Sequence, residues 1–272
     1  MSDELFLTLD IQFNSKQKSA TPILFCHGFK GFKDWGCNNL ISLKFAQSNY
    51  FFIKFNFSFN GVILDNLSDI SDAEAFGKNN YSRELEDIQL IINSLADSKS
   101  ELALFQDFFD IDKLVILGHS RGGSMALISA LEDQRIKKII SWGAVTDLSL
   151  YAEMKDPLEW QSEPALVINA RTGDTYPVYY QFYEDYLSNQ PRFEILENIA
   201  KLDKPLLIVH GSSDKAVSIS NSQELYKTVG HALFIAVENG GHTFGASHPW
   251  AESTLPQQLD EVIEECIEFL EM

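Results

Sequence analysis

The sequence predicts an α/β protein built on a mostly parallel β-sheet with helices on both faces. Short segments that are apolar nearly throughout indicate strands covered on both faces; they span residues 22–28, 51–58, 113–119, 137–146, 204–211 and 231–237. Helical periodicity marks the segments between them at residues 35–48, 81–98 and 122–134. Because strands that alternate with helices are typical of parallel sheets, we expect the α/β class.

Both ends of the chain fit this scheme. Residues 1–13 alternate apolar with polar side chains, which predicts a half-buried strand, and they lack the basic start and apolar block of a signal peptide. Residues 256–272 predict an amphipathic helix that opens at Pro256, a residue suited to a first helical turn. Its apolar face would carry Leu259, Ile263, Cys266, Ile267 and Leu270.

Two segments interrupt the alternation of strands and helices. Residues 60–80 are rich in Asn, Asp, Ser and Gly and predict a long loop. Residues 147–203 are too long for one crossover and contain an apolar segment followed by a turn signal. We therefore expect a single domain over residues 1–272 with an insertion at about 147–203, which we expect to form a small lid.

Composition limits the function classes. The chain has 272 residues, 45% of them hydrophobic, and a formal net charge of −18 without a basic cluster, which argues against nucleic acid and anionic membranes as partners. No uncharged apolar stretch approaches the roughly 18 residues that a membrane span needs. Three cysteines without metal-like spacing argue against a disulfide framework. We expect a soluble cytoplasmic protein without a metal site.

The main chemical motif is LVILGHSRGG at residues 114–123, where a predicted strand breaks into glycines around Ser120. Gly118 and Gly122 give the spacing G-x-S-x-G, in which glycines permit a sharp strand-to-helix turn that holds the serine in a strained conformation. Such a turn presents the hydroxyl to the cleft at the carboxyl edge of the sheet. The motif therefore predicts that Ser120 is a nucleophile.

A serine hydroxyl needs a general base, and the base needs a third group that orients it. In this type of sheet the chain order is serine, acid, histidine, each on a loop that follows a strand. Asp214 follows the strand at 204–211, and His242 lies in a glycine-rich loop after the strand at 231–237, which gives this order. Asp147 and His248 stay open as the alternative acid and base.

Two backbone N–H groups are needed to stabilise an oxyanion. One comes from the residue after the nucleophile and the other from a loop after an earlier strand. Arg121 supplies the first, and Phe29, in the segment HGFKGFKDWG, is the natural second donor. The Arg121 side chain has two alternatives, pairing with a substrate carboxylate or a solvated or structural salt bridge.

The segments HGFKGFKDW, GHSRGG, HGSSD and GGHTF, in this order across residues 27–244, resemble the α/β-hydrolase superfamily. Within it they look like the carboxylesterase-like members, with feruloyl-esterase-like and dienelactone-hydrolase-like relatives nearest. The resemblance implies an α/β-hydrolase fold with a mostly parallel eight-stranded sheet, a triad of Ser120, Asp214 and His242, and hydrolysis of esters or related acyl bonds without a cofactor. The insertion lies outside the shared motifs.

Candidate residues for a substrate pocket lie beside Ser120 and in the insertion. The candidates are His119, next to the predicted nucleophile, and four tyrosines that would share one face if residues 177–187 form a helix: Tyr176, Tyr179, Tyr180 and Tyr183. Packing within the domain is favoured for the tyrosines over lining the pocket mouth. If they line it, they favour an aromatic or medium acyl group.

The sequence therefore predicts a serine hydrolase, a carboxylesterase acting on a small-molecule ester through an acyl-enzyme intermediate. One alternative is a serine peptidase of the prolyl-oligopeptidase-like type, although no segment here is long enough for a propeller-sized domain. The other is a non-catalytic binding protein that keeps the fold. The oligomeric state stays open.

Overall fold

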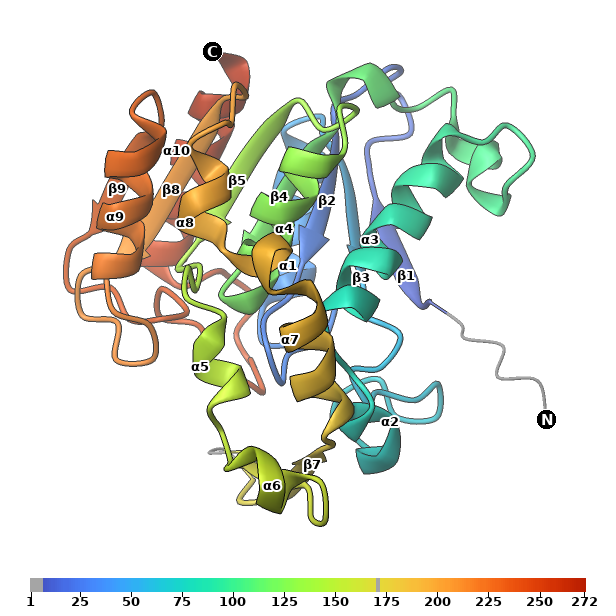
Figure 1. Cartoon of the computed structure of the whole chain (residues 1–272). Helices are drawn as coiled ribbons and strands as arrows, with labels where there is room; N and C mark the ends of the chain where they lie inside the picture. The colour runs from blue at the N-terminus through green and yellow to red at the C-terminus, as the bar shows by residue number, and fades with distance from the viewer. Residues whose placement is uncertain (1–6, 170–171) are drawn as a thin grey trace.

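The computed structural model describes residues 7–169 and 172–272 and centres on one mostly parallel sheet. Its strand order in the described residues is β1-β3-β2-β4-β5-β8-β9 (Figure 1). Only β1 runs antiparallel to its neighbour within this sheet, and the other pairs are parallel. The strands are β1 (Leu9–Gln12), β2 (Pro22–Cys26), β3 (Phe51–Phe55), β4 (Val115–His119), β5 (Lys138–Trp142), β8 (Leu206–Gly211) and β9 (Leu233–Val237).

Each of the six predicted apolar segments contains one strand of this sheet. The implied number of eight strands is wrong, because the main sheet has seven in the described part of the chain. Only β1 precedes β2 there, and the two strands of the 147–203 segment pair with each other instead of extending the main sheet. The class is as predicted, since apolar strands need cover on both faces.

The helices cover the two faces and create two separate cores. Side chains alternate along a strand, so Ile23 and Phe25 of β2 face one core while Leu24 and Cys26 face the other. The first core is covered by α1 (Asn38–Gln47) and α10 (Gln257–Glu271). The second core is covered by α3 (Tyr81–Ala96), α4 (Arg121–Glu132), α8 (Ile195–Ile199) and α9 (Ser220–Val229).

The remaining elements lie in the connections. The predicted loop at 60–80 contains the short helix α2 (Ala73–Gly77), and the 3-10 helices η1 (Glu101–Phe105) and η2 (Ile111–Lys113) precede β4. The segment 147–203 forms α5 (Ser149–Ala152), α6 (Pro157–Trp160), the antiparallel pair β6 (Ala165–Ile168) and β7 (Thr175–Val178), α7 (Gln181–Phe193) and α8.

The β6–β7 hairpin packs beside α2, at the bottom of the view in Figure 1. Trp160 of α6 is buried there, and its indole N–H donates a hydrogen bond to the Val178 carbonyl at 2.6 Å. Trp160 and Val178 belong to the second core, so this part of the molecule packs on the rest of the domain. Among helices in the two described ranges, none has both the length and the hydropathy for crossing a membrane.

Candidate active site

Ser120 lies in the sharp turn between β4 and α4. Its backbone has φ 55° and ψ −125°, a conformation that costs of order 1–3 kcal/mol for a residue other than glycine. A Cβ atom on Gly118 would lie 2.3 Å from the Gly122 carbonyl oxygen, and one on Gly122 would lie 2.3 Å from the Cys26 carbonyl oxygen. The motif glycines are therefore needed for close backbone approach, and they hold the serine at the carboxyl edge of the sheet.

Asp214 and His242 meet although 28 residues separate them. Asp214 follows β8, His242 follows β9, and these two strands are parallel neighbours. The Nδ1 atom of His242 lies 2.7 Å from Oδ2 of Asp214, so Nδ1–H donates to the carboxylate. This bond sets the tautomer of the imidazole and leaves Nε2 as a proton acceptor.

Hydrogen bonds keep the Asp214 carboxyl ionised. Burial raises its pKa, but the bonds from His242 and from the backbone amides of Val217 and Ala216 hold the pKa at about 2. The two amides lie 3.0 and 2.8 Å from Oδ1. The carboxylate is therefore anionic and oriented at neutral pH, as a group that stabilises a developing imidazolium must be.

His210 is a further neighbour of Asp214 that the sequence reasoning missed. Its buried Nε2 lies 3.2 Å from Asp214 Oδ2 and 3.0 Å from the Val217 carbonyl oxygen, while Nδ1 lies 2.7 Å from the Ser222 hydroxyl. Since two acceptors face Nε2, this atom carries the proton and Nδ1 accepts from Ser222. The usable signal was the spacing H-G-x-x-D, which places His210 four residues before the acid.

His119 belongs to the same site. Its Nε2 lies 2.8 Å from the carbonyl oxygen of His242, so it donates to the loop that carries the predicted base. Burial lowers the pKa of His119 to about 3, which keeps its ring neutral. His119 also lines the pocket described below.

The alternative acid and base have other partners in the structure, although His248 lines the same pocket as Ser120 and His242. The Asp147 carboxylate accepts hydrogen bonds from the backbone and hydroxyl of Ser149, at 3.0 and 2.6 Å, at the start of α5. His248 Nδ1 accepts from the Gly36 amide at 2.8 Å, and its Nε2 lies 3.1 Å from the Ser68 carbonyl oxygen. His248 therefore holds the loop that follows β2 and does not contact Asp214.

The two predicted oxyanion donors come from two segments that meet at Ser120. Phe29 is in the loop after β2, and a Cβ atom on the preceding Gly28 would lie 3.0 Å from the Ser120 Cβ. Arg121 is the first residue of α4, where a backbone N–H has no partner within the helix. In residues 7–169 and 172–272, neither amide donates to a protein acceptor. Both are therefore available to an oxyanion.

The Arg121 side chain is buried and forms an ion pair with Glu84 of α3, which is the structural alternative of the two expected. The guanidinium carbon also lies 4.1 Å from the centre of the Phe29 ring. Asn79 donates to the same Glu84 oxygen at 2.7 Å. Through its guanidinium, Arg121 thus contacts Phe29, so the two residues that carry the predicted oxyanion donors are joined.

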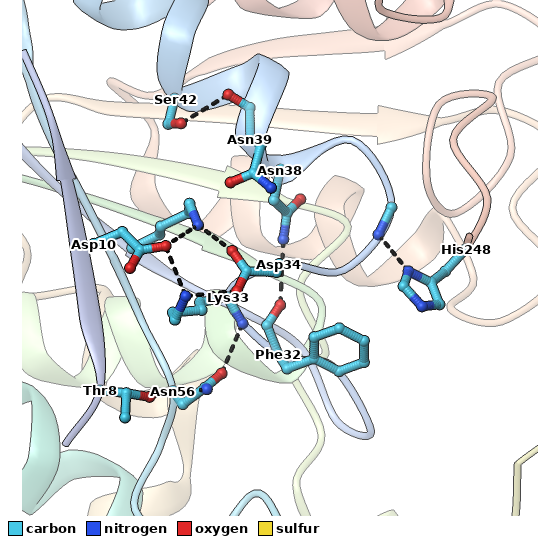
Figure 2. A network of polar contacts seen from close by, with 12 residues as sticks. Thr8, Asp10, Phe32, Lys33, Asp34, Asn38, Asn39, Ser42, Asn56 and His248 are labelled. Atoms are coloured by element: carbon cyan, nitrogen blue, oxygen red, sulfur yellow. Dashed lines mark hydrogen bonds and ion pairs between the residues drawn. The ribbon is translucent and has the colours of Figure 1, made fainter. Parts of the chain in front are cut away.

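An ionic network with two buried lysines holds the loop after β2 (Figure 2). Lys33 lies 2.6 Å from Asp10 of β1 and 2.5 Å from Asp34, and Lys54 of β3 also pairs with both carboxylates. The Lys33 amide donates to Asn56 at 2.8 Å. Burial lowers the pKa of Lys33, but its hydrogen bonds with the two carboxylates outweigh this and raise it.

The side chains of Ser120 and His242 line one pocket of about 590 Å³. Much of its wall is apolar. Phe25, Ile41, Trp142, Phe244 and Leu259 of the wall belong to the first core, and Phe32 and Trp35 come from the loop after β2. Asn169, directly after β6, also lines it. Within the described residues, no group of three or more His, Cys, Asp or Glu side chains could hold a metal ion.

The four candidate tyrosines lie outside the set of residues that lines this pocket. Tyr176 is in β7 rather than in a helix and packs on Phe76, with ring centres 5.2 Å apart. The Tyr179 hydroxyl donates to Glu74, and the Tyr180 and Tyr183 rings pack on each other. The helix expected from residue 177 begins only at Gln181, so the tyrosines do not share one helical face.

Sequence comparison identifies the family. Residues 77–255, more than half of the chain, match the model of the prolyl oligopeptidase family. The chain belongs to this family. The matched range contains Ser120, Asp214 and His242. A curated relative, the uncharacterized peptidase YtmA of Bacillus subtilis (strain 168), is 28% identical over 129 residues. That alignment spans 46% of this chain and 45% of YtmA.

Solved structures with the same fold include esterases and lipolytic enzymes. Est1E from Butyrivibrio proteoclasticus with bound ferulic acid superposes with a TM-score of 0.72 at 17% identity, covering 98% of this chain and 95% of that one. The metagenome-derived lipolytic enzymes LipS and LipT give 0.66 at 16% identity, with 97% and 96% covered. This prolyl oligopeptidase family member therefore has the α/β-hydrolase fold.

Proposed function

We propose that this family member is a serine hydrolase that cleaves carboxylic esters of small molecules. The observation that carries the proposal is the 2.7 Å bond between Asp214 and His242, beside a pocket that His242 and Ser120 both line. The strained turn at Ser120 supports it, because such strain persists where it presents a nucleophile. No cofactor enters the proposed reaction.

The proposed mechanism follows from these groups. His242 Nε2 takes the proton of Ser120 as Oγ attacks the acyl carbon, and Asp214 stabilises the imidazolium that forms. The Phe29 and Arg121 amides stabilise the oxyanion, and His242 then protonates the leaving alcohol. His242 then takes a proton from a water molecule as that water attacks the acyl-enzyme. The proton returns to Ser120 Oγ, and the carboxylic acid is released.

The pocket favours the binding of an ester with an apolar acyl or alcohol group, because most of the wall residues named above are aromatic or aliphatic. We also propose that segment 147–203 acts as a small lid, which the position of Asn169 on the pocket wall supports. A cytoplasmic location is proposed as well, and three free, buried cysteines support it.

The test is labelling with a fluorophosphonate followed by intact-mass spectrometry, together with turnover of p-nitrophenyl acetate and butyrate. We expect one adduct on the wild-type protein and neither adduct nor turnover for Ser120→Ala. Ser247→Ala is the matched control, because Ser247 lines the same pocket without a proposed role in the reaction. A folded wild-type protein without label or turnover would contradict the proposal and favour a binding protein.

Peptide cleavage is the second candidate, and membership of the prolyl oligopeptidase family favours it. The same triad would attack an amide carbonyl, with His242 protonating the leaving amine. Aminoacyl and dipeptidyl p-nitroanilides, measured beside the esters on the same samples, separate the two. Higher kcat/KM on the anilides than on every ester would assign the protein as a peptidase.

A further inference from the structure

Lys30 is a pocket residue to which the proposed reaction gives no role. It follows Phe29 in the loop after β2, has φ 59°, and lines the pocket that contains Ser120 and His242. Its Nζ atom donates a hydrogen bond to the Ile168 carbonyl oxygen of β6 at 2.9 Å. The Lys30 side chain therefore connects the loop after β2, which carries Phe29, with the 147–203 segment.

The charge of Lys30 is not compensated by a carboxylate. In residues 7–169 and 172–272, no Asp or Glu oxygen forms an ion pair with its Nζ atom, whereas Lys33 and Lys54 pair with two carboxylates each. Burial lowers the pKa of Lys30, which is the effect of a partly desolvated cation. An ammonium group has three donors, and the Ile168 carbonyl uses one of them.

The pocket itself differs in charge from the rest of the chain. The protein has 39 Asp and Glu residues against 21 Lys and Arg residues, yet no Asp or Glu is among the described residues that line the pocket. Two histidines of the lining, His27 and His119, are kept neutral by burial, which lowers their pKa to about 4 and about 3. Lys30 is thus a cation in a pocket that provides no counter-charge.

We propose that Lys30 binds a carboxylate of the substrate, so that the esters cleaved at Ser120 carry a free carboxylate in addition to the scissile bond. This inference rests on the proposed function. A substrate carboxylate would supply the missing counter-charge and accept the two remaining N–H donors of Nζ. Because Lys30 is next to Phe29, whose amide is a predicted oxyanion donor, the carboxylate would sit near the scissile carbonyl.

The test compares pairs of esters that differ only in charge. The pairs are p-nitrophenyl hemisuccinate and hemiglutarate, each with its neutral methyl ester. The wild-type protein should show the higher kcat/KM on the charged member of a pair. In Lys30→Met the ratio of charged to neutral kcat/KM should fall about fivefold, as for the loss of one ion pair that is open to solvent on one side. Lys30→Arg should retain most of the ratio.

Lys99→Met is the control, since it removes the same charge from an exposed turn. It should leave the wild-type ratio unchanged. An equal ratio in wild type and Lys30→Met would overturn the inference while the ester activity itself stood. Equal losses on both members of a pair would assign Lys30 to holding the loop on β6 and would also overturn it.

A binding measurement keeps the inference testable without turnover. Isothermal titration calorimetry with 4-phenylbutyrate and its neutral amide, on Ser120→Ala and on Ser120→Ala with Lys30→Met, reads carboxylate recognition directly. We expect tighter binding of the carboxylate only where Lys30 is present. Equal binding of the two compounds by Ser120→Ala would refute the role of Lys30, whereas absent fluorophosphonate labelling of the wild type would refute the proposed function.

Discussion

Replacing Glu84 with glutamine tests whether the buried Arg121–Glu84 ion pair supports the two predicted oxyanion donors. The Arg121 and Glu84 side chains are 4% and 2% exposed, so Glu84→Gln would leave a guanidinium charge buried without its carboxylate. Breaking such a pair costs about 3–5 kcal/mol. Because the Phe29 ring stays 4.1 Å from the guanidinium and cation–π attraction offsets part of this loss, we expect the lower end, about 3 kcal/mol.

The catalytic effect should follow from the same contact. Arg121 and Phe29 carry the predicted oxyanion donors, and loss of one donor typically lowers kcat by about 10²–10³-fold. A shift of the guanidinium displaces these amides without removing them, so we expect kcat to fall about tenfold with a smaller change in KM. Urea denaturation and ester turnover, measured on one preparation, read both effects.

Glu86→Gln is the matched control for this experiment. Glu86 lies on the same helix, and its pair with Arg83, at 3.3 Å, is exposed to solvent. Such pairs contribute about 0–1 kcal/mol, so stability and kcat should stay close to wild type. If Glu84→Gln behaved like Glu86→Gln, the Arg121 pair would have no part in stabilising or positioning the oxyanion donors.

Two further predictions concern Asp214, the acid of the proposed triad, and the ionic network. Asp214→Asn should lower kcat about 10⁴-fold, because an amide favours the wrong tautomer of His242. The Asp214 pKa is lowered from 3.8 to about 2, so its contribution of about 2 kcal/mol is present above pH 4 and lost as pH falls through 2. Urea denaturation against pH should lack this acid transition in Asp214→Asn, and an unchanged acid limb would contradict the linkage. Lys54→Met leaves the Asp10 and Asp34 carboxylates with Lys33 as their lysine partner, so it should destabilise the fold by about 2 kcal/mol and lower kcat. Lys18→Met, in an exposed pair, should cost less than about 1 kcal/mol, and equal effects of the two lysine variants would refute the role of the network.

The strands and the motif at residues 114–123 could be predicted because their signals are local. A strand covered on both faces must be apolar along its length, and a turn as tight as the one at Ser120 admits only glycine at Gly118 and Gly122. The order of Ser120, Asp214 and His242 could be predicted for a related reason. Parallel strands place their carboxyl ends at one edge, so loops distant in the chain converge there.

Other parts of the site depend on partners that no local pattern identifies. The contacts of Glu84 with Arg121 and of Lys54 with Asp10 form only when α3 packs on α4 and β1 pairs with β3. A lysine within the apolar segment 51–58 was the visible sign of the second pair. Such a sign shows that a buried charge needs a counter-charge, but not which residue supplies it.

The tyrosines of the insertion show the same limit. Their spacing suggested one helical face. Tyr176 instead lies in β7, which pairs with β6, and α7 begins only at Gln181, after Tyr179 and Tyr180. The sequence by itself determined the α/β class, the strands and the chain order of Ser120, Asp214 and His242, because burial on both faces and tight turns restrict residue types locally. Only the tertiary structure decided which charges pair, which aromatic residues line the pocket and where Lys30 lies, because these depend on the packing of elements far apart in the chain.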